Sequence, residues 1–165
     1  MKSSYYPLKT GNHWKYQFSN GDEYTLKIIS EENGIYQMHN SFDDTTTPIK
    51  REGSKILGVV AGSNELKERL NEDLLVGDTW EFEYQANGID NVLRHSIKDQ
   101  LSYLEVNGKT YQDVLVVEAE LLMVISGNLT AINYFTQYYY AKGVGNILTT
   151  TSQGDRIELV AYQVS

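Results

Sequence analysis

Two glutamates, Glu118 and Glu120, are the residues whose type and spacing come closest to a pair for acid–base chemistry. They lie in the most apolar stretch of the chain, from Val114 to Ile125, and a separation of two places both on one face of a strand. If that face is buried, the two carboxylates could transfer protons or bind a cationic ligand. If it is the outer face, they form a solvated stripe, and the sequence leaves both interpretations open.

A tyrosine-rich segment is the second candidate for chemistry. Tyr134, Tyr138 and Tyr140 share one face of a strand expected at about 131–140. A tyrosine combines an apolar ring with a polar hydroxyl, so this face could line a ligand pocket. Core packing, with the hydroxyls reaching the rim of the sheet, fits the same pattern.

Other catalytic and metal-binding signatures are missing from the sequence. The chain has no cysteine, which excludes thiol nucleophiles, disulfides and cysteine-based zinc sites. Its three histidines, His13, His39 and His95, are far apart, and there is no Gly-x-Ser-x-Gly motif. The segment Gly143-Val144-Gly145 lacks the following Lys-Ser/Thr of a phosphate loop. We therefore expect no enzyme activity, no metal and no cofactor.

Charge and length limit the partners. The 165 residues carry a net charge of −8, which argues against nucleic acid, whose binding needs a basic surface. No apolar run approaches the ~20 residues of a membrane span. The start, Met-Lys-Ser-Ser, contains no apolar signal segment. We expect the cell envelope if a leader has been removed and the cytoplasm otherwise, and the oligomeric state stays open.

One motif occurs twice, at residues 8–18 and 74–84. Both copies read Leu-x-x-Gly-(Asn/Asp)-x-Trp-x-(aromatic)-x-(aromatic). Gly followed by Asn or Asp predicts a turn, and the alternating aromatic residues predict a strand with one buried face. The aromatic faces, led by Trp14 and Trp80, are expected in the core, with an aromatic ligand platform as the alternative. The repeat predicts one domain, 1–165, with two weakly similar units at about 8–62 and 74–165.

The same motif carries a resemblance. Tyr5-Tyr6-Pro7-Leu8 with the first copy, the second copy's Val-Gly-Asp-Thr-Trp, and the Tyr-Tyr-Ala-Lys-Gly-Val-Gly-Asn-Ile of residues 139–147 resemble a loose group of bacterial proteins, often predicted to be envelope lipoproteins. The three segments cover about a quarter of the chain. The resemblance implies an envelope protein and supplies no catalytic residues. The chain departs from the group at its start, which lacks a lipidated cysteine.

Alternation and turn signals predict an all-β protein. Asn-Gly pairs at 20–21, 87–88 and 107–108 mark hairpins between roughly eleven or twelve strands. Two of these strands are expected at about 90–98 and 100–106. The one helix is expected at 63–71, capped by Ser63 and with Leu66 and Leu70 on one face. So many antiparallel strands predict a meander curled into a barrel or strongly curved sheet, with the helix over one opening and a two-sheet sandwich as the alternative.

These patterns favour a non-catalytic binding module that holds an apolar or amphipathic small molecule in a sheet-lined cavity. The candidate ligand-binding residues are Tyr134, Tyr138, Tyr140, Glu118 and Glu120. The alternative is a structural or protein-interaction domain of the bacterial cell envelope, which would use a sheet edge or an aromatic patch. A hydrolase or isomerase with an unannounced site is the third hypothesis.

Overall fold

The protein is all-β in the computed structural model, which describes residues 4–60 and 63–165. These residues form twelve strands: β1 His13–Phe18, β2 Glu23–Glu32, β3 Ile35–Asn40, β4 Thr45–Glu52, β5 Lys55–Val59, β6 Leu66–Asn71, β7 Thr79–Ala86, β8 Ile89–Val106, β9 Lys109–Ile125, β10 Asn128–Ala141, β11 Gly145–Thr151 and β12 Arg156–Gln163.

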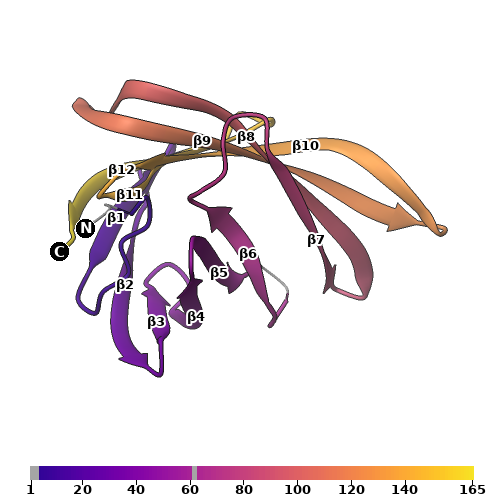
Figure 1. Cartoon of the computed structure of the whole chain (residues 1–165), viewed down its shortest axis with the longest axis horizontal. Helices are drawn as coiled ribbons and strands as arrows, with labels where there is room; N and C mark the ends of the chain where they lie inside the picture. Colours follow the sequence, from indigo (N-terminus) through magenta and orange to yellow (C-terminus); the bar gives the residue numbers. More distant parts are fainter. Residues whose placement is uncertain (1–3, 61–62) are drawn as a thin grey trace.

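All twelve strands belong to one antiparallel sheet that curls into a nearly closed barrel (Figure 1). The strand order is β6-β5-β4-β3-β2-β1-β12-β11-β10-β9-β8-β7. The edges of the sheet are therefore β6 and β7, which follow each other in the sequence. We call the place where these two edges approach each other the seam. The Trp80 Nε1–H on β7 donates to the Glu68 carbonyl on β6 at 2.9 Å, so one side-chain hydrogen bond spans the seam. The curled sheet of the sequence prediction is confirmed, and the sandwich is not formed.

The turns follow the Asn-Gly signals. Asn87 and Gly88, between β7 and β8, have φ values of 54° and 75°. Positive φ at both central residues is typical of the type I′ turn, whose twist matches that of the flanking strands. Asn107 and Gly108 repeat this pattern between β8 and β9, with φ values of 51° and 78°.

The two copies of the tryptophan motif form the same local structure. Gly11 and Gly77 both have φ of 98°. The Gly11 N–H donates to the Ile28 carbonyl at 2.8 Å, and the Gly77 N–H donates to the Ile97 carbonyl at 2.9 Å. Each glycine thus ties the turn before its strand to the strand that pairs with it, which is β2 in the first copy and β8 in the second. The division of the whole chain into two repeat units stays a prediction.

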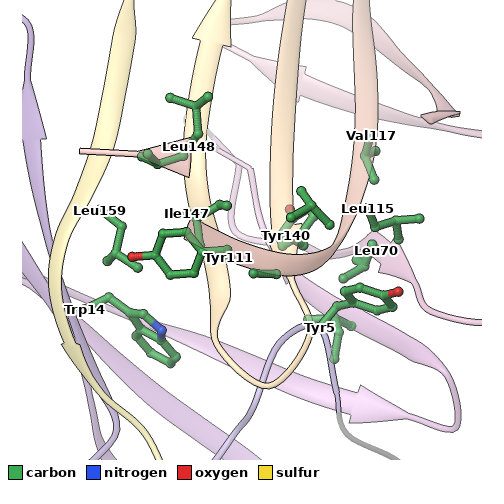
Figure 2. Packing of buried hydrophobic residues seen from close by; sticks show 14 of the residues in the cluster. Tyr5, Trp14, Leu70, Tyr111, Leu115, Val117, Tyr140, Ile147, Leu148 and Leu159 are labelled. Atoms are coloured by element: carbon green, nitrogen blue, oxygen red, sulfur yellow. The ribbon is translucent and has the colours of Figure 1, made fainter. Parts of the chain in front are cut away.

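The core lies inside the curl of the sheet, near the place where β1 meets β12 (Figure 2). Trp14 is 1% exposed, and its Nε1–H donates to the Val144 carbonyl at 2.6 Å. The core prediction is therefore correct for the first motif. Trp80 is only partly buried and packs against the edge of this cluster. Residues 114–117 of β9 are all buried, as the doubly apolar pattern predicted.

The helix predicted at 63–71 is wrong. Residues 66–71 form strand β6, which pairs with β5, and Ser63 and Asn64 are irregular. The physical reason is that Leu66 and Leu70 are four residues apart. A spacing of four is typical of one face of a helix and of one face of a regular strand, so the two leucines did not distinguish between them. Residues 66–71 form a strand because their backbone hydrogen bonds pair with the edge of β5, which would otherwise be open.

The two strands predicted at about 90–98 and 100–106 are one strand, β8, of 18 residues. Its ladder with β9 is shifted at Lys98, since Ile97 pairs with Val117 and Asp99 pairs with Val116. One extra residue on one strand is a β-bulge, which bends the strand and leaves it continuous. The polar Lys98-Asp99-Gln100 segment thus marks a bulge and not a turn.

The N-terminal strap, residues 4–12, precedes β1 and contacts segments that lie far from it in the sequence. The Ser4 carbonyl accepts a hydrogen bond from the Gly143 N–H at 2.7 Å, and the Tyr5 hydroxyl accepts one from Gln100 Nε2 at 2.8 Å. On the other side, Glu72 accepts hydrogen bonds from the Tyr5 N–H and the Ser4 hydroxyl. The strap therefore joins the β10–β11 turn and β8 to the end of β6.

Glu72 is the residue that fastens this strap. Burial alone would raise the pKa of its carboxyl, but hydrogen bonds from Arg51 and Ser4 and the Arg51 charge more than offset this and hold the pKa below its usual value. The Arg51 Nη1 atom lies 2.6 Å from Glu72 Oε2. Only 11% of the Glu72 side chain is exposed, so the carboxylate has lost most of its contact with water and depends on the Arg51 charge to offset that loss.

We expect Arg51→Met to lower the free energy of unfolding by about 2 kcal/mol, because it leaves the Glu72 carboxylate buried without its cation. Urea denaturation at pH 7 measures this loss. Arg94→Met is the matched control: Arg94 pairs with Glu81 on an exposed surface, and its loss should cost under about 0.5 kcal/mol. Equal losses in the two variants would show that the strap does not depend on the Arg51–Glu72 pair.

Candidate ligand-binding cavity

A cavity of about 490 Å³ opens on the concave side of the sheet. Its walls come from β1 to β6 on one side and from β10, β11 and β12 on the other. On several strands the lining residues alternate, as with Tyr24 and Leu26 on β2 and with Met38 and Asn40 on β3. This alternation is what a strand presents when one face points into an enclosed space. The N-terminal strap adds Tyr6 to the wall.

Five tyrosines give the cavity its character, and we call it the tyrosine cavity. They are Tyr6, Tyr16, Tyr24, Tyr138 and Tyr140. Burial raises the pKa of Tyr6 and of Tyr24 to about 12, and it raises the pKa of Tyr16 and of Tyr140 further still. These four hydroxyls are therefore uncharged at physiological pH and act as neutral hydrogen-bonding groups.

The hydroxyls differ in whether the protein already uses them. The Tyr16 hydroxyl donates to the Asn146 carbonyl at 2.7 Å, and the Tyr6 hydroxyl lies 3.8 Å from the Met38 sulfur. Within residues 4–60 and 63–165, the hydroxyls of Tyr24, Tyr138 and Tyr140 have no hydrogen-bond partner. Three hydroxyls with free bonding capacity in an apolar wall can orient a ligand.

Two of the candidate residues from the sequence lie in this wall. Tyr138 and Tyr140 line the cavity from β10, where their rings are 6.3 Å apart and stacked. Tyr134 is on the same face of β10 and pairs with Leu121, but it lies beyond the cavity lining. That these three tyrosines bind a ligand remains a prediction.

The structure does not bring Glu118 and Glu120 to the cavity. Both project from the opposite face of β9, where Gln137 and Phe135 are their partners on β10. Glu118 Oε1 lies 3.4 Å from Lys98 Nζ, and Glu120 Oε1 lies 4.0 Å from an Arg94 nitrogen. Each carboxylate therefore has its own cation on the outer face, and a ligand-binding role for either stays untested.

His95 is a buried polar side chain that sequence reasoning did not place at a site. It is 2% exposed, and its ring stacks on Trp80 with centroids 4.7 Å apart. Its Nδ1 atom has no hydrogen-bond partner in the described part of the chain. Burial first, and then the Arg69 charge, lower the pKa of this imidazole to about 4. His95 is therefore neutral at physiological pH.

Arg69 is the cavity residue that sequence reasoning missed altogether. It lies on β6, within the segment predicted to be helical. In the structure it lines the cavity, and its guanidinium carbon lies 5.9 Å from the centre of the Tyr138 ring. Tyr6 was missed as well, because the strap that carries it has no strand pattern.

The described residues bring no group of three or more His, Cys, Asp or Glu side chains together as a metal site. In residues 4–60 and 63–165 there is also no helix long and apolar enough to cross a lipid bilayer.

No protein-family model matches the chain, and no curated protein matches it. Solved structures share its fold at low sequence identity. An exported protein, by its description, with a YmcC-like fold from Bacteroides fragilis is 7% identical, with a TM-score of 0.61 and coverage of 98% of this chain and 99% of that one. A protein described as a lipoprotein from Parabacteroides distasonis is 9% identical, with a TM-score of 0.50 and coverage of 99% and 100%.

YmcC from Escherichia coli, described as a hypothetical lipoprotein, is 10% identical, with a TM-score of 0.47 and coverage of 93% of this chain and 85% of that one. At identities this low, the matches to the Bacteroides fragilis and Parabacteroides distasonis proteins show the fold and nothing about ligands. The fold is thus shared over nearly the full length of both this chain and the Bacteroides fragilis protein.

Proposed function

We propose that this protein is a non-catalytic binding module that holds an apolar or amphipathic small molecule in the tyrosine cavity. The observation that carries the proposal is the cavity itself. Its volume of about 490 Å³ falls in the range of small-molecule sites, roughly 300–1,000 Å³. Aliphatic and aromatic side chains make up most of its lining, and free tyrosine hydroxyls supply the polar contacts that orient a ligand.

A location in the bacterial cell envelope is part of the proposal. It is supported by the descriptions of the Bacteroides fragilis and Parabacteroides distasonis proteins as exported and as a lipoprotein, respectively. A small-molecule carrier or sensor in that compartment needs an enclosed apolar space, and a curled sheet provides one without any cofactor. This support is analogy between proteins of one fold.

Native mass spectrometry tests the binding proposal directly. Protein purified from its host should carry an excess mass that disappears on denaturation. Thr47→Phe, which points a ring into the cavity, should abolish the excess mass. Thr46→Phe is the matched control, because Thr46 is exposed, next along β4 and absent from the cavity lining. Retained ligand in Thr47→Phe, or an equal loss in both variants, would contradict a ligand in this cavity.

A second candidate function, a protein-interaction domain, is favoured by one observation. Ile89, Ile125 and Leu129 are large apolar residues, each between 42% and 50% exposed, at the hairpin ends of β8, β9 and β10. Exposed apolar residues that gather at one end of a molecule suit a contact with another protein. A dimer without retained ligand in the same native spectra would favour this function over the carrier.

A further inference from the structure

Arg69 reaches the cavity because of an irregularity in strand pairing. On β5 the neighbours Ile56 and Leu57 pair with Leu70 and Glu68, so Arg69 is the extra residue of a β-bulge. Without the bulge, Arg69 would point to the face opposite Leu70. With it, both Arg69 and Leu70 line the cavity. Bulges at sheet edges commonly re-aim a side chain in this way, often beside a functional site.

The strand beside the bulge leaves room for this side chain. Gly58 on β5 has no side chain, and a Cβ atom there would lie 3.4 Å from Arg69 Cγ. The aliphatic part of Arg69 therefore lies directly over the β5 backbone. One guanidinium nitrogen, Nη1, donates to the Val59 carbonyl at 3.1 Å. This anchor holds the guanidinium at the cavity wall.

The charge of Arg69 is not matched by a carboxylate. The chain has four arginines, and three of them form ion pairs: Arg51 with Glu72, Arg94 with Glu81, and Arg156 with Glu158. Among residues 4–60 and 63–165, no carboxylate oxygen lies within 4.0 Å of an Arg69 guanidinium nitrogen, the distance that defines an ion pair. An arginine has five N–H donors, and the described residues use one of them.

The electrostatic effect of this charge extends through the cavity. The Arg69 charge opposes the burial that raises the pKa of Tyr6 and of Tyr140. One carboxylate, Asp43, also lies at the lining, but it is exposed and already accepts hydrogen bonds from the Thr45 hydroxyl at 2.6 Å and the Thr45 N–H at 3.2 Å. A chain with net charge −8 thus presents an unpaired cation inside its apolar cavity.

We propose that Arg69 binds the oxyanion of an amphipathic ligand, a carboxylate or a phosphate, while the apolar part of that ligand packs against the cavity tyrosines. The inference rests on the proposed function and names the chemical class of the ligand. A guanidinium is suited to this role because its planar fork can bond two oxygens of one anion. Tyr138 and Tyr140 line the cavity from β10, across from β6, and the Arg69 guanidinium carbon is 5.9 Å from the centre of the Tyr138 ring. The free hydroxyls of both tyrosines can therefore donate to the same headgroup.

The test is titration calorimetry with simple probes at pH 7.5. Decanoate and decyl phosphate carry an oxyanion on an apolar chain, decanol carries the chain alone, and acetate and inorganic phosphate carry the anion alone. We expect the two amphipathic anions to bind more tightly than decanol. Arg69→Met should weaken their binding by about 10-fold or more and leave decanol unchanged. Arg69→Lys, which keeps the charge, should lose less affinity than Arg69→Met.

Arg94→Met is the control for loss of a positive charge, because Arg94 is paired on the outer face with Glu81. It should leave all five affinities unchanged. Urea denaturation adds a readout for a purely structural role: Arg69→Met should be at least as stable as the wild type, since it removes a partly buried, unpaired charge.

Three outcomes would overturn the inference. Equal binding of decanoate and decanol, unaffected by Arg69→Met, would remove the anion site and leave the cavity proposal intact. Binding of acetate or phosphate as tight as that of the amphipathic anions would mean a free anion and not an amphipathic ligand. A loss of stability in Arg69→Met that Arg69→Lys restores, without any change in affinity, would assign Arg69 to the structure alone. Failure of every chain-bearing probe to bind the wild type would contradict the proposed function itself.

Discussion

Replacing Trp14 by alanine is expected to lower the free energy of unfolding by about 3–5 kcal/mol. The indole is 1% exposed at the place where β1 joins β12, so its removal leaves a large cavity in the core. It also removes the donor to the Val144 carbonyl. A Cβ atom at Gly145 would lie 3.0 Å from Trp14 Nε1, which shows how closely the β10–β11 turn fits around this ring.

Two further variants separate the contributions to this loss. Trp14→Phe keeps an aromatic ring but leaves the Val144 carbonyl without its donor, and it should cost about 1–3 kcal/mol. Trp80→Ala is the matched control at the same position of the second motif. Trp80 is only partly buried, so we expect a loss of about 1–2 kcal/mol. Urea denaturation followed by circular dichroism gives all three values, and a larger loss for Trp80→Ala than for Trp14→Ala would contradict this assignment of the core.

Acidification from pH 7 to pH 5 is expected to cost the wild type about 2 kcal/mol of stability through His95. The unfolded chain binds a proton at this imidazole near its ordinary pKa of 6.5, whereas burial holds the pKa of the folded state at about 4. Between these two values the unfolded state binds more protons than the folded state. Lower pH therefore favours unfolding, and the contribution is lost progressively as the pH falls from about 6.5 to about 4.

His95→Leu tests this prediction because leucine fills similar space and does not titrate. Chemical denaturation at pH 7, 6 and 5 should show a clearly smaller loss of stability in the variant than in the wild type. Glu72 does not confuse the comparison, since its pKa is lowered from 4.5 and its contribution is lost only at more acidic pH. An identical pH dependence in wild type and His95→Leu would show that another group titrates. Because the Arg69 charge also lowers the pKa of His95, Arg69→Met should reduce the same slope.

Local sequence patterns were sufficient to predict most of the fold. The Asn-Gly pairs at 87–88 and 107–108 specify positive φ values that few other residues adopt, so two adjacent residues are enough to predict each of these hairpin turns. The aromatic alternation after Gly11 likewise predicts the strand that buries Trp14. The helix at 63–71 was mispredicted because apolar residues spaced by four fit both helix and strand, and pairing with β5 is not a local property.

The candidate site was harder to predict, and the reason is pairing register. Arg69 faces the cavity only because β6 has one residue more than the part of β5 it pairs with, and nothing in its neighbouring residues announces this bulge. Glu118 and Glu120 could be placed on one face of β9 but not on a given side of the sheet, because residues 114–117 are apolar on both faces. The curl of the sheet decides that they point outward and that Tyr138 points inward.

The strand order also has a consequence for the kinetics of folding. All ladders among the described residues join strands that are neighbours in sequence, with the single exception of β1 with β12. Hairpins close short loops within microseconds, whereas joining the first strand to the last closes a loop of nearly the whole chain and costs far more entropy. The meanders β1–β6 and β7–β12 can therefore form early and separately. Because β12 is synthesised after the other eleven strands and contributes Ile157 to the cavity wall, the complete tyrosine cavity arises only after β12 has been made.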